Sequence, residues 1–294
     1  MTIPGKSVEV RLDNILFATD FSKSIETEKL YVKALADSYG SVVQLMHVVD
    51  LGVAFKAPDA GVSIDIFRRF GEESLKRLRC EMAAKNICTK TILCEGTDPA
   101  NEILRAAQEN SVDLLVVGTR AHNGLAKLVL GSTAEVLIHR ATCPILTIGP
   151  EADSPEEPLN FRKIVYATDF SAEAARAGAF AWSFARDFGA HIYLCHVSPA
   201  PDGTMQVDGQ ELNEEFTRAL QRLVPNLTRE RCEPECVLEH GYAADGILLL
   251  AHRVKADLIV LGTRLTPHWF DRFKAGVAFQ VIGRVHCPVL TIRG

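Results

Sequence analysis

The run Gly131-Ser132-Thr133 has residue types that can hold an anion, because it is small and hydroxylated and stands just before a helical pattern. Backbone N–H groups and two hydroxyls can approach a phosphate there, and the dipole of a helix that begins at this point favours negative charge. The preceding loop begins at Gly118 and contains neither Gly-Lys-Ser/Thr nor Gly-x-Gly-x-x-Gly. It is therefore predicted to hold phosphate without being a Walker loop or a dinucleotide fingerprint.

Asp20, like Gly118, follows a short apolar run that is typical of a buried strand. In a doubly wound sheet, ligands bind beyond the carboxyl ends of the strands, so both residues would lie at the binding edge. Two structural alternatives stay open. Asp20 recurs as Asp169, and its carboxylate could satisfy backbone amides where the first helix starts. Gly131 could merely begin a helix, with Ser132 as the capping residue.

Two further polar residues recur in the second half of the chain. Arg120 recurs as Arg264, so a structural ion pair explains it as well as a phosphate contact does. His47 recurs as His196 inside an apolar strand. A histidine in that setting is more often a hydrogen-bonded core residue than a ligand.

These residues belong to a sequence that occurs twice. Residues 15–22 and 164–171 share Ala-Thr-Asp-Phe-Ser at an offset of 149, and residues 113–120 match 257–264 at an offset of 144. Two other blocks recur in the same order, which indicates a duplicated domain. We expect a first domain at residues 1–150, an acidic Pro-rich linker at 151–160, and a second domain at 161–294.

Each copy reads as short Val-, Ile- and Leu-rich runs that alternate with helical patterns. Runs of this kind without clean alternation are typical of parallel strands covered on both faces. The fold class is therefore α/β, with two tandem doubly wound, Rossmann-like domains of five parallel strands each. The expected strands are residues 14–19, 42–48, 89–94, 113–118 and 144–148, then 163–168, 191–197, 234–238, 257–262 and 288–292.

The charge, the apolar stretches and the cysteines of the chain argue against several classes of protein. A net charge of −5 and no basic cluster argue against nucleic-acid binding, and no apolar stretch approaches the ~20 residues that span a bilayer. The start of the chain does not resemble a signal peptide, and eight scattered cysteines fit a reducing cytoplasm. Cys232, Cys236 and His240 do not favour a metal site, because Pro234 prevents a helix from aligning them.

The chain resembles the universal stress protein family in its tandem-domain form. The resemblance lies in Ala-Thr-Asp-Phe-Ser, Met-His-Val-Val, Cys-Pro-Ile-Leu-Thr-Ile and the loop spacing. ATP-binding members carry Gly, two residues, Gly, nine residues, then Gly-Ser or Gly-Thr. Here the pattern is Gly118, two residues, Ala121, nine residues, Gly131-Ser132. If position 121 needs a positive φ, alanine costs about 1–2 kcal/mol there. If it needs only a close approach of the backbone, a methyl group is tolerated.

The resemblance implies the strand order 3-2-1-4-5 in each domain and an ATP molecule across the ends of the first and fourth strands, with accompanying Mg²⁺ left open. It places the adenosine against Ala18, Asp20 and Val48. It places the phosphates against Gly118, Thr119, Arg120, Ala121, His122, Gly131, Ser132 and Thr133.

The second copy departs from this pattern. Counting from the Cys-Pro landmark, Gly131-Ser132-Thr133 corresponds to Ala275-Gly276-Val277, which has no hydroxyl. Leu265 adds bulk to the loop and Pro267 removes an N–H. We expect nucleotide binding in the first copy only.

The leading hypothesis is a cytoplasmic, nucleotide-binding stress-response protein that acts as a regulatory module read by an unidentified protein partner. A scaffold without nucleotide and a slow ATPase or phosphotransferase are the alternatives. The sequence shows no catalytic triad and no obvious carboxylate pair. Apolar last strands at residues 145–148 and 289–292 favour pairing of the two domains, and dimerisation of the whole chain stays open.

Overall fold

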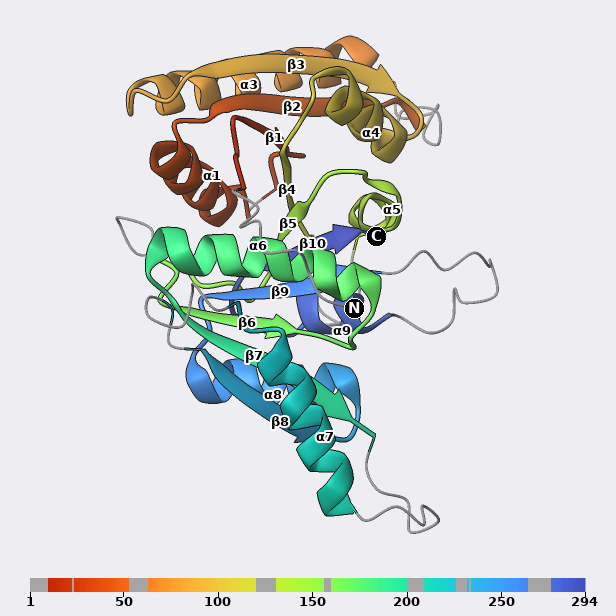
Figure 1. Cartoon of the computed structure of the whole chain (residues 1–294). Helices are drawn as coiled ribbons and strands as arrows, with labels where there is room; N and C mark the ends of the chain where they lie inside the picture. Colours follow the sequence, from red (N-terminus) through yellow and green to blue (C-terminus); the bar gives the residue numbers. More distant parts are fainter. Residues whose placement is uncertain are drawn as a thin grey trace. The chain divides into compact units, whose positions relative to one another are not determined.

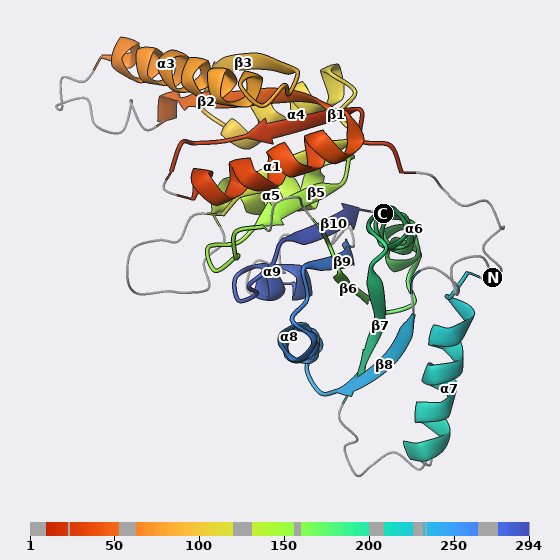
Figure 2. The same ribbon diagram turned by 90° about the vertical axis from the view of Figure 1, so that its left-hand side faces the viewer.

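The structure is a computed structural model that describes residues 10–22, 24–52, 63–119, 131–155, 160–199, 209–225, 232, 234–263 and 276–293. The chain divides into two compact units (Figures 1 and 2). One spans Arg11–Leu159, and the other contains Asn160–Gly294 together with Val10. Val10 joins the second unit through its N–H, which donates a hydrogen bond to Ser183 Oγ at 3.2 Å.

The first unit contains a five-stranded parallel sheet in the order β3-β2-β1-β4-β5. Its strands are β1 (Asn14–Ala18), β2 (Val42–Asp50), β3 (Thr89–Gly96), β4 (Leu114–Gly118) and β5 (Ile145–Ile148). Its helices are α1 (Ile25–Tyr39), α3 (Ile64–Ala83), α4 (Pro99–Glu109) and α5 (Ser132–Arg140). The predicted fold class and strand order are confirmed for this copy.

The second unit repeats the arrangement, with the parallel order β8-β7-β6-β9-β10. Its strands are β6 (Lys163–Ala167), β7 (His191–Ser198), β8 (Glu235–His240), β9 (Leu258–Thr263) and β10 (Val289–Arg293). Its helices are α6 (Ala172–Phe188), α7 (Gly209–Arg222), α8 (Ala243–Val254) and α9 (Val277–Ile282).

Helices cover both faces of each sheet (Figures 1 and 2). Right-handed crossovers send α1 and α3 to one face and α4 and α5 to the other. The central strands β1 and β4 are consequently buried on both sides, and Leu114–Val117 are at most 3% exposed. This burial explains why their sequences are continuously apolar rather than alternating.

Local signals fix the helix ends. α4 starts after Asp98, whose Oδ1 accepts the N–H of Asn101 at 3.1 Å, with Pro99 at the first helical position. Gly40 and Gly189 end α1 and α6 in the left-handed conformation, at φ 66° and 61°. Among the described helices, none is both long enough and apolar enough to cross a membrane.

In the sequence of α3, Ile64, Phe67, Leu75, Leu78 and Met82 approximate one apolar stripe, which predicts that all five pack into the core. On α3, Leu75, Leu78 and Met82 pack into the core as the periodicity predicts, but Phe67 is 37% exposed. Phe67 instead lines a cavity at the edge of the first sheet. Periodicity identifies apolar positions but cannot distinguish a core wall from the wall of a binding site.

Candidate functional site

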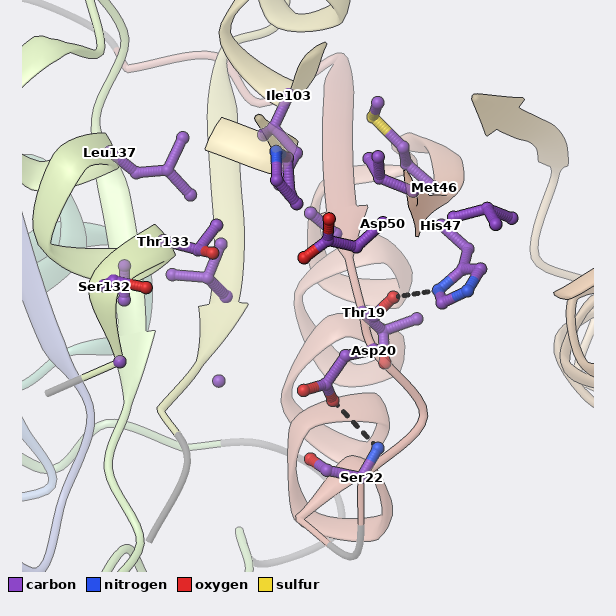
Figure 3. A pocket seen from close by; sticks show the side chains of 18 of the residues that line it. Thr19, Asp20, Ser22, Met46, His47, Asp50, Ile103, Ser132, Thr133 and Leu137 are labelled. Carbon is purple, nitrogen blue, oxygen red and sulfur yellow. Dashed lines mark hydrogen bonds between the residues drawn. The ribbon is translucent and has the colours of Figure 1, made fainter. Parts of the chain in front are cut away.

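A cavity of about 450 Å³ lies at the carboxyl ends of β1, β2 and β4, where the first sheet reverses its strand order. Residues of α3, α4 and the N-terminus of α5 complete its walls. Figure 3 shows Ser132 and Thr133 on α5 across the cavity from Asp20 and Asp50. Asp20 follows β1, and Asp50 is the last residue of β2. The location is the one expected for ligands in doubly wound sheets.

The structure brings together most of the residues that the sequence singles out. Those that line the cavity are Ala18, Asp20, Val48, Gly118, Gly131, Ser132 and Thr133. Thr119 is not part of the lining: it is 2% exposed, and its N–H donates to the Ile148 carbonyl at 3.1 Å. Arg120, Ala121 and His122 lie outside the described residues.

Asp20 has a structural role in its loop. Its Oδ1 accepts the N–H of Ser22 at 2.8 Å (Figure 3). Phe21, between them, adopts a positive φ of 58°. The second copy repeats both features, with Asp169 accepting the N–H of Ser171 at 3.0 Å. The structural interpretation of the recurring aspartate is therefore confirmed, and in the first copy this aspartate also lines the cavity.

His47 is a hydrogen-bonded structural residue. Its Nδ1 lies 2.8 Å from the Thr19 carbonyl (Figure 3), and His196 makes the same contact with Thr168 at 2.9 Å. A carbonyl can only accept, so Nδ1 carries the proton in both rings. The bond ties β2 to the loop after β1 and thereby shapes the floor of the cavity.

The start of α5 does not match the alternative in which Ser132 is the capping residue of the helix. Gly131, in an extended conformation, occupies the N-cap position, and Ser132 is the first helical residue rather than the cap. Within the described part of the chain, no side-chain hydrogen bond caps this helix, and an added Cβ at Gly131 would meet no atom within 4 Å. The first N–H groups of a helix lack intrahelical partners, so a ligand in the cavity can reach them.

A buried acid, Glu28, also lines the cavity although the sequence analysis did not single it out. It is 3% exposed, and its carboxyl group lies so close to the Cα of Gly118 that a Cβ at that position would collide with it. Burial raises the pKa of Glu28 to about 7; hydrogen bonding to Ser24 opposes this rise, and the charge of Asp20 adds to it.

The sequence held a signal for Glu28. At the offset of 149 its counterpart is Ala177, so an acid replaces a small residue on the buried face of a helix. Asp50 was missed for a different reason: it ends β2, at the same carboxyl edge as Asp20, but no repeat marks it because its counterpart is Pro199. Phe70 joins Phe67 in the lining from α3.

The second copy has a different geometry at the equivalent positions. An added Cβ at Gly262, the counterpart of Gly118, would lie 2.5 Å from the backbone N of Ala174 in α6. The helix itself therefore occupies the space that a side chain, Glu28, fills in the first copy. α6 also begins at Ala172, equivalent to position 23, whereas α1 begins two residues later at Ile25.

The helix start that corresponds to the start of α5 is also altered in the second copy. The N-cap of α9 is Gly276, so the structural counterpart of Gly131 is Gly276 and not Ala275, a displacement of one residue from the sequence-based equivalence. Ser132 and Thr133 then correspond to Val277 and Ala278, so both hydroxyls are still lost. Leu265, Pro267 and Ala275 lie outside the described residues.

Among the described residues, no group of three or more His, Cys, Asp or Glu side chains is arranged to hold a metal ion. No Lys or Arg is found among the described side chains of the cavity wall. Its described charged groups are the carboxylates of Asp20 and Asp50 and the carboxyl group of Glu28.

Comparisons with known proteins agree on one family. The family model for the universal stress protein family matches residues 11–149 and again 160–293. A universal stress protein of Methanocaldococcus jannaschii is 32% identical over 138 residues, which is 46% of this chain and 80% of that protein. One from Thermus aquaticus is 33% identical over 143 residues, covering 45% of this chain and 99% of that protein.

Among solved structures, a universal stress protein from Archaeoglobus fulgidus superimposes with a TM-score of 0.76 at 22% identity, covering 97% of both chains. A functionally unknown protein from Pseudomonas aeruginosa gives a TM-score of 0.68 at 16% identity, covering 98% of this chain and 95% of that one. These likenesses support the same two-copy fold. With two family matches that together span most of its length, the chain belongs to the universal stress protein family.

Proposed function

We propose that the first copy binds ATP in the cavity at the carboxyl edge of its sheet. The adenosine contacts Ala18, Asp20 and the backbone around Val48. The phosphates lie toward the start of α5, at Gly131, Ser132 and Thr133, and toward the loop that begins at Gly118 and carries Arg120, Ala121 and His122. Mg²⁺ accompanies the nucleotide as its counterion.

One observation carries the proposal: a cavity of about 450 Å³ at the switch point of the sheet, walled by the N-terminus of a helix and by small residues. No described residue lies within 4 Å of an added Cβ at Gly131, and Ser132 and Thr133 add two hydroxyl donors at that N-terminus. Unpaired helical N–H groups and hydroxyls are the donors that phosphate oxygens accept from. The apolar residues Phe67, Phe70 and Ile103 supply a wall suited to the adenosine.

We propose further that the second copy binds no nucleotide and serves as a structural partner of the first. Val277 and Ala278 offer no hydroxyl, and the backbone of α6 lies against Gly262. On this proposal the two domains, residues 1–150 and 161–294, associate through their apolar last strands. Bound ATP then stabilises one conformation or assembly state of a cytoplasmic stress-response protein, which a partner protein reads.

The experiment is extraction of nucleotide from the purified protein. The protein is denatured by heat, and the supernatant is separated by ion-exchange chromatography. Recovery of an adenine nucleotide, or micromolar binding of added ATP, supports the proposal. If no adenine nucleotide is recovered and added ATP does not bind, the protein is a scaffold that binds no nucleotide. Steady release of ADP from bound ATP assigns the protein to the slow ATPases.

A further inference from the structure

Glu28 is built into the cavity in a way that the second copy does not repeat. Its carboxyl group fills the space between α1 and the end of β4, beside Gly118. In the second copy Ala177 occupies the equivalent position, and the backbone of α6 comes close to Gly262. Glu28 therefore separates α1 from the end of β4 at the cavity wall. It does so in the first copy, which has the two hydroxyls of Ser132 and Thr133 at the start of α5.

Among the residues that the structure describes, the groups that face Glu28 do not offset a negative charge. Asp20 approaches it from the loop after β1. β2 contributes His47 and Asp50 to the same cavity, while β4 and the start of α5 contribute no charged side chain to the described wall. On its own helix, Ser24 hydrogen-bonds to it. An ionised Glu28 would be a third carboxylate in this cavity, and, unlike Asp20, one that water cannot screen.

We propose that Glu28 is a proton-dependent specificity residue, which must be neutral for the cavity to accept an anionic nucleotide. The inference rests on the proposed function. ATP carries several negative charges, and an ionised carboxylate that is buried in the wall of the same cavity repels them. The neutral acid removes that repulsion and presents an O–H donor at the cavity wall. Binding above neutral pH then takes up one proton at Glu28.

The expected size of the effect follows from the population of the neutral form. Burial holds the pKa of Glu28 at about 7, so both forms are populated near neutrality. If only the neutral form is competent, the apparent dissociation constant is the intrinsic one divided by the neutral fraction. That fraction falls from about nine-tenths at pH 6 to about one-tenth at pH 8, so affinity falls about tenfold through Glu28 alone.

The test is calorimetric titration of the full chain with ATP and Mg²⁺ at pH 6 and pH 8. Wild type is compared with Glu28→Gln, which has the shape of the neutral acid but cannot ionise, and with Glu28→Leu as a second uncharged variant. Glu26→Gln is the matched control, because Glu26 lies on the same helix with its side chain 72% exposed and paired with Lys29. Circular dichroism verifies that each variant is folded.

The decisive quantity is the ratio of the wild-type to the variant dissociation constant, because the protonation of ATP itself cancels in it. The inference predicts that this ratio rises about tenfold from pH 6 to pH 8 for Glu28→Gln and Glu28→Leu and stays constant for Glu26→Gln. If ATP binds but the ratio is constant for Glu28→Gln, the inference is overturned and the proposed function stands. If no protein binds ATP at either pH, the proposed function is overturned and this inference with it.

Discussion

The carboxyl group of Glu28 lies against the Cα of Gly118, at the place where β4 ends and the proposed phosphate loop begins. The two residues are 90 positions apart in the sequence and form a matched pair: a side chain at 118 and a carboxyl group from 28 cannot occupy this space together. The motif spacing explains Gly118 by the approach of a nucleotide. The packing of α1 requires a glycine at this position as well.

The pair predicts an energetic coupling. Gly118→Ala forces its methyl group into the Glu28 carboxyl, and overpacking of this kind destabilises a fold by about 1–3 kcal/mol. Glu28→Ala provides room, so the double variant should cost less than the sum of the two single changes. Urea denaturation of the four proteins measures this coupling. Gly131→Ala is the control, because its methyl group meets no described residue within 4 Å. Additive effects of the Gly118 and Glu28 changes would refute the pairing.

Stability should also depend on pH through Glu28. The pKa of Glu28 is raised from 4.5 to about 7 in the folded state, so between these values the folded protein holds a proton that the unfolded chain has released. The contribution of Glu28 is therefore fully present below about pH 4.5 and lost as the pH rises through about 7. It amounts to on the order of 3 kcal/mol, because each tenfold difference in proton affinity between the two states corresponds to about 1.4 kcal/mol.

Glu28→Gln should abolish this part of the pH dependence. The variant should then be more stable than wild type at pH 8, where wild type must bury a carboxylate. Equilibrium denaturation at intervals from pH 5 to pH 8 gives the two curves. Parallel curves would show that Glu28 titrates with an ordinary pKa and is better solvated than the structure indicates.

Gly131→Val should remove ATP binding without unfolding the protein. The Cβ of the valine would meet none of the described residues within 4 Å, and its side chain would stand at the start of α5, where the phosphates are proposed to lie. Gly276→Val is the matched control, because it makes the same change at the N-cap of α9, where an added Cβ makes only ordinary contact with Phe279 at 3.6 Å. Binding is measured by calorimetry. Equal affinities of Gly131→Val and wild type would remove the start of α5 from the phosphate site.

Most of the fold follows from the sequence. The expected strands agree with the observed ones within a few residues, because buried parallel strands are continuously apolar and their ends are marked by turn residues. The periodicity of α3 also identified its core positions. It misassigned Phe67, because a residue that lines a cavity has the same apolar character as one in the core.

The candidate site was predictable where the residue type itself marks a strand end or a helix start. Asp20, Gly118 and Gly131 stood out because they lie at strand ends or a helix start, where backbone geometry restricts the choice of residue. Glu28 was not predictable from its own helix, since nothing local shows that a glutamate points inward. Its role depends on the absence of a side chain at a glycine on another element.

The most direct test of the account is the stoichiometry of ATP binding to the full chain, measured by calorimetry in the presence of Mg²⁺. One ATP per chain is expected, with all binding lost in Gly131→Val and retained in Gly276→Val. The missing hydroxyls at Val277 and Ala278 leave phosphate acceptors unpaired, at about 1–3 kcal/mol each, which is enough to exclude the second copy. Two sites per chain, or one site that survives Gly131→Val and disappears in Gly276→Val, would contradict it.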